Sequence, residues 1–356
     1  MDADVSAELA GLVKEAAFAG RSLFIRGHGS KRFYGRRCET DDELDTRGHR
    51  GILSYDPSEL VITVRGGTPL AEVEAALAEA GQMLPFEPPR FAADSTIGGA
   101  VAAGLSGPGR PWRGAVRDVL LGVQLLDGQG QIMNFGGQVM KNVAGYDLSR
   151  LMAGALGTLG VLLGVSVRLL PRPRAEKTLL LECDAEASRA LMRSFRAAPV
   201  PLTGSSYTAG QLHLRLSGHE SVLDAFHDTH GGSWVENGDD YWRGLRDHAL
   251  PFFHRPGRLW RISVPPDTAP LALEGESLVD WGGAQHWVRT PEDGDRVRRL
   301  ARDAGGHAVA FRQDDDERDD PVFQPLDETI AGLHRRLKSV FDPKSVLNPG
   351  RVYGDW

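Results

Sequence analysis

The chain has little cysteine and no excess of positive charge. It contains two cysteines in 356 residues, Cys38 and Cys183, and they form no CxxC pair. Two isolated thiols support neither a disulfide framework nor a zinc site, and an iron–sulfur centre would have to belong to a partner. The formal net charge of −7 argues against a general nucleic-acid binder, which would present a basic face. These absences favour a reduced, cytoplasmic setting.

Long hydrophobic runs are also scarce. The start, Met1-Asp2-Ala3-Asp4, is acidic and no apolar segment follows it, so we expect no secretory signal. Residues 151–167 carry no charge, and this length is at the lower limit for crossing a bilayer. Four glycines interrupt the stretch. It predicts a helix ending near Ala155 and a buried strand over about residues 161–169, rather than a membrane span.

Glycine, in contrast, is abundant, with 43 residues. Many of them lie between Asp94 and Val165, at the ends of apolar segments and beside small residues. Glycine is needed where the backbone turns with positive φ or comes very close to another group. The pattern is typical of a chain whose amides line a flat or phosphorylated ligand. It predicts the floor of a dinucleotide site.

A first candidate loop follows the short apolar strand 23–25. Its sequence is Arg26, Gly27, His28, Gly29, Ser30 and Lys31. Two glycines allow successive N–H groups to point at an anion, and Ser30 adds a hydroxyl. The loop lacks the third glycine of a Rossmann fingerprint and the lysine spacing of a Walker motif. An ordinary strand–turn therefore remains an alternative.

A second candidate segment begins at residue 94. Thr96 is placed to cap a helix over residues 97–103, whose first turn would offer unpaired amides and a favourable dipole to an anion. Asp147 fits the N-cap of a later helix as well as it fits a ligand role. The candidate residues of this segment are Asp94, Ser95, Thr96, Gly98, Gly99, Gly104, Ser106, Gly107, Arg110, Gly145, Tyr146, Asp147, Gly154, Gly157, Thr158, Gly160 and Val161.

The chain divides at a Pro/Arg linker, residues 171–174. We expect a cofactor domain over residues 1–172 and an α+β domain over residues 173–338, because strand-like and helix-like segments alternate there in a way that suggests an antiparallel sheet. The tail, residues 339–356, is rich in turn residues. The expected strands of the second domain are 178–183, 211–216, 259–264, 285–288 and 307–311, and the expected helices are 186–197, 219–230 and 292–304.

Together these motifs resemble the FAD-binding domain of the vanillyl-alcohol-oxidase / p-cresol-methylhydroxylase (PCMH) superfamily. The matching pieces are Arg26-Gly27-His28-Gly29-Ser30, Asp94-Ser95-Thr96-Ile97-Gly98-Gly99, Gly145-Tyr146-Asp147-Leu148 and Gly157-Thr158-Leu159-Gly160-Val161. The ending Phe341-Asp342-Pro343 and Leu347-Asn348-Pro349-Gly350 is similar to the lactate and glycolate dehydrogenase branch. Residues 59–70, 84–89 and 139–147 resemble the FAD-binding subunits of bacterial glycolate dehydrogenase.

The resemblance implies an α+β fold: a two-subdomain PCMH-type domain that holds FAD, followed by an α+β cap domain with an antiparallel sheet and a tail that returns to the FAD domain. Residues 26–31 would wrap the pyrophosphate, residues 94–107 would line the ribityl chain and isoalloxazine, and residues 154–161 would lie at the adenosine end. In covalent members a histidine follows two glycines. Here His28 lies between Gly27 and Gly29, so we expect non-covalent FAD. We expect no metal.

One motif of that branch is missing. Its catalytic subunits carry a paired-histidine sequence, H-x-G-D-G-N-x-H, which does not occur in this chain. Oxidation of a 2-hydroxy acid needs a base near the hydroxyl and a cation for the carboxylate. Possible suppliers are His286, His307, Arg261, Arg289 and Arg312, although such residues are more often structural strand residues. The catalytic residues therefore stay unassigned.

The resemblance predicts an FAD-binding subunit of a multi-subunit glycolate dehydrogenase. It would work with a catalytic flavoprotein subunit and an iron–sulfur subunit on a small 2-hydroxy acid, in the cytoplasm or held at the inner membrane through its partners. Two alternatives stay open: a self-sufficient FAD-dependent 2-hydroxy-acid dehydrogenase or oxidase, and a non-catalytic scaffold that keeps the FAD fold.

Overall fold

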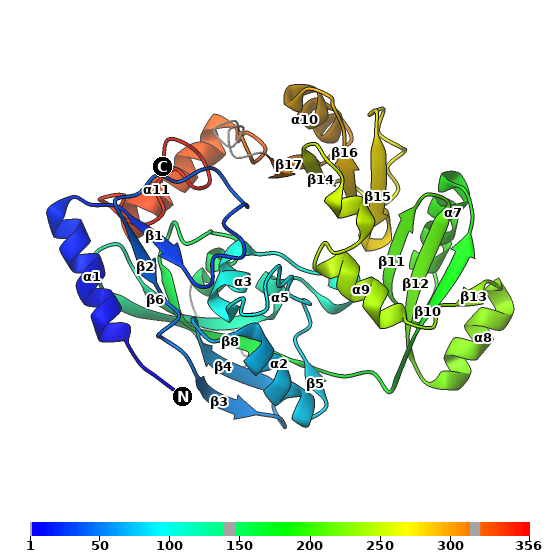
Figure 1. The fold of residues 1–356 in the computed structure, drawn as a ribbon, viewed down its shortest axis with the longest axis horizontal. Coiled ribbons are helices and arrows are strands. Elements are labelled where there is room, and N and C mark those ends of the chain that lie inside the picture. The colour runs from blue at the N-terminus through cyan, green and yellow to red at the C-terminus, as the bar shows by residue number, and fades with distance from the viewer. Residues whose placement is uncertain (1, 138–146, 314–320) are drawn as a thin grey trace. The chain divides into compact units, whose positions relative to one another are not determined.

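A computed structural model describes residues 2–137, 147–313 and 321–356, and in it the chain forms two units (Figure 1). The first unit comprises Met1–Leu105, Ala115–Pro171 and Asp315–Trp356, and the second comprises Ser106–Gly114 and Arg172–Asp314. This division differs from the predicted one at two places. Residues 106–114 pack with the second unit, and the stretch from residue 321 to 338 packs with the first.

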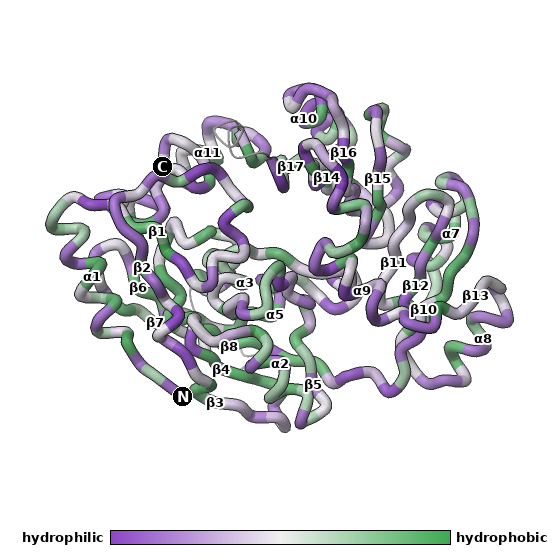
Figure 2. The backbone as a smooth tube through the Cα atoms, viewed as in Figure 1, coloured by the Kyte–Doolittle hydropathy of each residue, from purple (hydrophilic) through white to green (hydrophobic). Residues whose placement is uncertain are grey.

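The first unit is organised around strand β8, Val161–Arg168, in a five-stranded sheet of order β3-β4-β8-β6-β7 whose neighbours are all antiparallel. Seven of its eight residues are buried, because both faces of the sheet are covered. Leu162 packs in a cluster with helices α2 and α3, whereas Leu163 packs with helix α1. Figure 2 shows hydrophobic colouring along the central strands of this sheet.

A second, two-stranded sheet carries the first candidate loop. Strand β1 pairs with β2 in parallel, and Leu23 also forms a parallel bridge with Leu347 of the tail. The N–H of Leu23 donates to Val346 O at 2.7 Å, and the N–H of Asn348 donates to Leu23 O at 3.0 Å. The tail therefore extends this small sheet along the free edge of β1.

A buried ion pair stabilises the tail. Lys338 Nζ donates to Asp342 Oδ2 at 2.6 Å, to Thr158 O at 2.8 Å and to Leu347 O at 2.9 Å. Asp342 in turn accepts from the N–H groups of Val346 and Leu347. A buried pair of this kind is stable only when further hydrogen bonds satisfy both charges, as they do here.

The elements of the first unit are α1 (Ser6–Ala19), β1 (Leu23–Arg26), β2 (Asp42–Asp45), β3 (Ile52–Asp56), β4 (Val61–Arg65), α2 (Leu70–Glu79), β5 (Gln82–Met83), α3 (Ile97–Ala103), α5 (Val116–Val119), β6 (Leu120–Leu126), β7 (Ile132–Gly136), α6 (Leu148–Met152), β8, β9 (Leu170–Pro171) and α11 (Glu328–Phe341). The uncharged stretch 151–167 thus contains the end of α6 and most of β8, close to the prediction. None of the described helices is long and apolar enough to span a membrane.

The second unit is an eight-stranded antiparallel sheet of order β13-β10-β12-β11-β15-β16-β14-β17. Helices α7 and α8 cover one end of the sheet and α10 covers the other end on the same face. Helix α10 is strongly hydrophilic (Figure 2), and its apolar residues Val297 and Ala301 pack against the sheet. The expected α+β class with an antiparallel sheet is confirmed.

The elements of the second unit are α4 (Arg110–Arg113), β10 (Ala175–Glu182), α7 (Ala185–Arg196), β11 (Leu202–Thr208), β12 (Gln211–Gly218), α8 (Glu220–His230), β13 (Ser233–Trp234), α9 (Gly238–Arg246), η1 (Pro251–His254), β14 (Leu259–Ser263), β15 (Glu276–Asp280), η2 (Trp281–Gly283), β16 (Gln285–Arg289), α10 (Gly294–Asp303) and β17 (His307–Arg312). The five predicted strands and three predicted helices are present. Strands β11 and β15 and helix α9 were not predicted.

Candidate functional site

The loop after β1 exposes a run of unpaired backbone donors. The N–H groups of Gly27, His28, Gly29 and Ser30 donate to no acceptor among the described residues. The chain reverses locally, because Arg32 N donates back to Gly29 O at 2.9 Å, and Gly29 has φ +86°. Backbone donors without a protein partner are rare, and a concave run of them is a typical anion site. The geometry is compatible with the predicted phosphate loop, and the ligand role of the loop stays a prediction.

The loop is tied to the second candidate segment by two side-chain contacts. The hydroxyls of Ser30 and Ser95 lie 2.8 Å apart and form a hydrogen bond. His28 Nδ1 lies 2.5 Å from Asp94 Oδ2, although the two groups are not aligned as a hydrogen bond. A Cβ on Gly27 would lie 2.3 Å from Thr96 Oγ1, so only glycine lets the loop pass this close to Thr96.

Helix α3 corrects one expectation. Thr96 caps it as predicted, accepting from Gly99 N at 3.2 Å. Its other first-turn amides are not available to a ligand, since Ile97 N donates to Thr68 O, Gly98 N to Gly66 O and Ala100 N to Thr96 O. These acceptors come largely from a chain segment that the sequence pattern did not connect with the helix. The unpaired amides that suit an anion therefore lie in loop 27–30 and not in α3.

The C-terminal tail completes the walls around the loop. Asn348 Oδ1 accepts from Ile25 N at 2.8 Å, and Asn348 Nδ2 donates to Leu156 O at 2.7 Å. The buried guanidinium of Arg351 donates to the carbonyls of Arg32, Tyr34 and neighbouring residues that follow the loop. Neither residue is among the predicted site residues, although the tail sequence carries part of the family resemblance.

These parts enclose one cavity of the first unit. Its lining is Phe24, Ile25, Arg26, Gly27, His28, Gly29, Ser30, Lys31, Arg32, Thr96, Gly99, Ala102, Ala103, Leu156, Asn348 and Arg351. We call it the cradle. Four cationic side chains line it, and the acidic neighbours Glu43 and Asp45 pair with Arg26. Small residues of α3 leave room for a flat or extended ligand.

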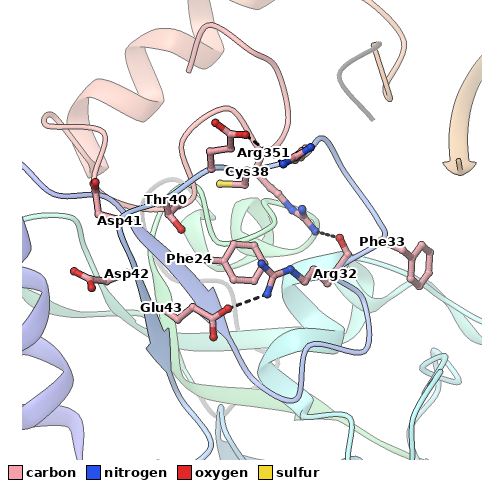
Figure 3. Close-up of a pocket in the computed structure, with 11 residues that line it drawn as sticks. Phe24, Arg32, Phe33, Cys38, Thr40, Asp41, Asp42, Glu43 and Arg351 are labelled. Atoms are coloured by element: carbon pink, nitrogen blue, oxygen red, sulfur yellow. Dashed lines mark hydrogen bonds and ion pairs between the residues drawn. The ribbon is translucent and has the colours of Figure 1, made fainter. Parts of the chain in front are cut away.

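A second cavity of about 920 Å³ shares Phe24, Arg32 and Arg351 with the cradle (Figure 3). Arg32 donates to Glu43 at 2.8 Å and its guanidinium lies 4.7 Å from the centre of the Phe24 ring. Burial raises the pKa of the Cys38 thiol, whose Sγ donates to Pro349 O at 3.1 Å. The thiol therefore acts as a packing group of the tail.

Several predicted residues build the walls by packing rather than by facing the cradle. A Cβ on Gly98 would lie 2.7 Å from Gly66 O, and a Cβ on Gly104 would lie 2.7 Å from Gly154 Cα. A Cβ on Gly157 would lie 2.8 Å from Asn348 Nδ2 and 3.1 Å from Ile25 Cδ1. Thr158 bonds to Ala155 O, Gly160 packs on Leu125 and Val161 begins β8.

Other predicted residues lie elsewhere. Asp147 is the N-cap of α6 and accepts from Arg150 N at 3.2 Å. Ser106, Gly107 and Arg110 belong to the second unit, where Gly107 O accepts from Trp281 Nε1 at 3.0 Å and the Arg110 guanidinium lies 4.6 Å from the Trp281 ring centre. Gly145 and Tyr146 lie outside the described residues. A ligand role for these residues stays a prediction.

The candidate catalytic residues of the second unit do not converge on one point. His286 stands opposite Ile262 and Val279 on the helix-covered face of the sheet. Arg261 and His307 stand in alternate register on the other face. Burial lowers the pKa of both histidines. His286 therefore cannot share a site with Arg261 across the sheet.

The three arginines do share a neighbourhood, around a histidine that the sequence did not single out. His248 is buried and stacks on Phe253 with ring centres 3.9 Å apart. Burial and the charges of Arg312, Arg261 and Arg289 hold the pKa of His248 well below its usual value. Arg289 is used structurally, since it donates to the carbonyls of Phe252, Phe253 and Gly257. No sequence periodicity distinguishes His248.

Comparison with known sequences identifies the cofactor. A family described as FAD binding domain matches residues 3–136, which include loop 26–31 and helix α3. The cradle fits such a group: four unpaired amides suit a diphosphate, and a cleft lined by glycine and alanine suits an extended dinucleotide. FAD is the cofactor of this unit, as predicted.

Curated relatives cover the whole chain. Glycolate oxidase subunit GlcE of Escherichia coli (strain K12) is 46% identical over 354 residues, which is 99% of each chain. A D-lactate dehydrogenase of Archaeoglobus fulgidus is 28% identical and covers 98% of this chain and 89% of its own. Glycolate oxidase subunit GlcD of Bacillus subtilis (strain 168) is 34% identical over 44% of this chain and 33% of its own.

A solved structure supports the fold. p-Cresol methylhydroxylase with bound substrate matches with a TM-score of 0.73 at 15% identity, covering all of this chain and 88% of that one. The predicted PCMH-type fold is confirmed. Because the GlcE match is this close and runs from end to end, the chain belongs to the GlcE family of FAD-binding glycolate oxidase subunits.

Proposed function

We propose that this chain is the FAD-binding subunit of a multi-subunit glycolate dehydrogenase, which oxidises glycolate to glyoxylate and passes the electrons through FAD to a partner or acceptor. The observation that carries the proposal is 46% identity to a glycolate oxidase subunit over 99% of both chains. A catalytic flavoprotein subunit, an iron–sulfur subunit and a cytoplasmic setting, with attachment to the inner membrane only through partners, belong to the same proposal.

The cradle residues would hold the cofactor through the backbone. The amides of Gly27, His28, Gly29 and Ser30 would donate to the pyrophosphate, and nearby cationic side chains would balance its charge. Asn348 would keep β1, the tail and residue 156 in register around it. Bound FAD supplies two-electron redox chemistry. We propose that it is held without a covalent link, since His28 lies between two glycines and against Asp94.

A matched pair of glycine variants tests the cradle. Gly29 and Gly20 both have positive φ, +86° and +66°, and both have room for a Cβ. Gly29→Ala and Gly20→Ala should therefore cost similar backbone strain, about 1–2 kcal/mol. We expect only Gly29→Ala to weaken FAD binding, by about tenfold or more, measured by flavin fluorescence titration of the apoprotein. Equal affinities in the two variants would place the pyrophosphate elsewhere.

A second experiment separates the proposal from its alternatives. The purified chain is mixed with glycolate or D-lactate and the flavin absorbance is followed, alone and after co-expression with its proposed partners. The proposal expects FAD in the chain, no turnover by the chain alone and turnover in the complex. Fast reduction by the chain alone would select the self-sufficient enzyme, whereas a folded chain without FAD in any state would select the scaffold.

A further inference from the structure

The helix-covered face of the second unit's sheet has a gap in its middle. Helix α7 packs on β11, and α10 packs on β17 and the neighbouring strands. Between them Tyr207, Val279 and His286 stand side by side on β11, β15 and β16, because they are direct partners in the strand register. Tyr207 borders the cluster that α7 and α8 cover, and Ala185 and Arg189 of α7 line one side of the cavity over this row.

A strap of chain, residues 265–275, closes the gap instead. Asp267 forms ion pairs with Arg193 and Arg196 of α7, the first at 3.3 Å. Arg296 of α10 donates to Ala272 O at 3.3 Å. The strap is therefore fastened at both ends to the flanking helices.

The strap also needs one special glycine beneath it. Gly283 has φ +99°, and a Cβ there would lie 2.4 Å from Pro266 O. A residue with a side chain would push the strap off the sheet. The strap thus has a defined height above the strands, and it encloses a cavity of about 130 Å³. An engineered cavity of about 150 Å³ accommodates benzene, so this cavity has the size of a small ring or a branched chain.

The cavity has apolar walls and a few polar groups. Pro266, Leu271, Leu273, Val279 and Val288 supply much of the wall. A predominantly apolar lining with a small number of placed polar groups is typical of a small-molecule site. The polar groups would orient a bound ligand, whereas a simple packing defect has no such groups.

His286 is the first of the polar groups. Its Nε2 lies 3.2 Å from Gly283 O, so Nε2 carries the proton and Nδ1 is left as an acceptor. Burial lowers the pKa of His286, which keeps the ring neutral at neutral pH. It cannot supply a charge, but it can accept a hydrogen bond from a ligand hydroxyl.

Arg189 is the second polar group and supplies the charge. Its Nε is buried and lacks a hydrogen-bond partner, and no described residue forms an ion pair with its guanidinium. The nearby arginines that fasten the strap, Arg193, Arg196 and Arg296, are all engaged. A partly buried guanidinium without a partner is best matched by a planar carboxylate, which it binds through two parallel hydrogen bonds.

We infer that this cavity binds a small monocarboxylic acid with an apolar carbon skeleton, its carboxylate on Arg189 and its body between the strap and the strands. A hydroxyl beside the carboxylate would find its acceptor in His286. The site lies in the second unit and does not involve the cradle, so it stands independently of the proposed function. Since the strap joins two helices, an occupied cavity would hold them together.

The test uses the FAD-loaded chain and two probes, sodium benzoate and sodium isovalerate, with benzamide as the uncharged control. Isothermal titration should show saturable binding of at least one acid and weaker binding of benzamide. Arg189→Gln should reduce the affinity for the acid by about tenfold or more, since a hydrogen bond to a charged group is lost. Arg243→Gln, an exposed arginine with its own pair on α9, should leave it unchanged.

Val279→Phe supplies a second, steric test. Its ring would fill the cavity from β15 and should abolish binding while circular dichroism shows the fold retained. The inference is overturned if neither acid binds, if benzamide binds as well as benzoate, or if both Arg189→Gln and Val279→Phe keep the parent affinity. FAD content is recorded separately, and its loss would not bear on this site.

Discussion

Asn348 joins three segments of the cradle, and its replacement should destabilise the first unit. The side chain accepts from Ile25 N and donates to Leu156 O, and the residue is 4% exposed with φ +43°. Asn348→Ala leaves one donor and one acceptor unsatisfied. Each costs about 1–3 kcal/mol, and a side chain other than Asn at this φ adds about 1 kcal/mol. Together these costs predict that the first unit loses about 3–7 kcal/mol of stability.

Asn348→Gly is the matched control, because it removes the same two hydrogen bonds but tolerates the positive φ. It should be destabilised by about 1 kcal/mol less than Asn348→Ala. Urea unfolding is followed by the rise in fluorescence of released flavin, which reports the first unit, and by circular dichroism, which reports both. If Asn348→Ala unfolds at the parent urea concentration, the side chain does not hold the segments together and the reasoning fails.

Three further outcomes are expected. Gly98→Val should destabilise the first unit by about 1–3 kcal/mol or more, because its Cβ would lie 2.7 Å from Gly66 O, and loss of flavin should follow. Gly99→Ala, whose Cβ would contact only a hydroxyl, should cost less stability in urea unfolding. Acid precipitation should leave the yellow colour in the supernatant, and colour in the pellet would show a covalent link through His28 or another residue. Desolvation lowers the pKa of His213 from 6.5 to about 4, so the unfolded state binds the extra proton in this window and stability is lost as the pH falls from 6.5 to 4. His213→Phe removes this titration, so between pH 7.5 and pH 5 it should lose about 2 kcal/mol less stability than the parent, measured by urea unfolding at both values.

The elements that were predicted correctly have local causes. Thr96 and Asp147 are N-caps because a side-chain oxygen can reach an amide three residues ahead, which the sequence alone encodes. Strand β8 is predictable because a strand buried on both faces is a continuous apolar run. The linker near residue 172 is predictable because proline interrupts regular structure. Each signal lies within a few residues of its effect.

The missed elements depend on distant partners. Strand β2 reads Asp-Glu-Leu-Asp, and only Leu44 is buried, so its extended form comes from backbone pairing with β1. Strand β15 begins with two exposed residues and is fixed by β11 and β16 on its two sides. Helix α11 is not predictable from the sequence pattern, because its buried residues Lys338 and Phe341 include a charge that is stable inside the protein only beside Asp342.

The glycines of the cradle show why the site itself was only partly predictable. Glycine marks close approach, but the sequence does not say whether the approaching group is a ligand or another segment of the chain. Gly98 and Gly104 approach the backbone of Gly66 and Gly154, and they bring strands and helix near enough to form the walls. Gly29 instead gives its turn a conformation that leaves neighbouring amides without a protein acceptor. Substitution at the first kind of position should therefore reduce stability before affinity, and substitution at the second kind should reduce affinity before stability.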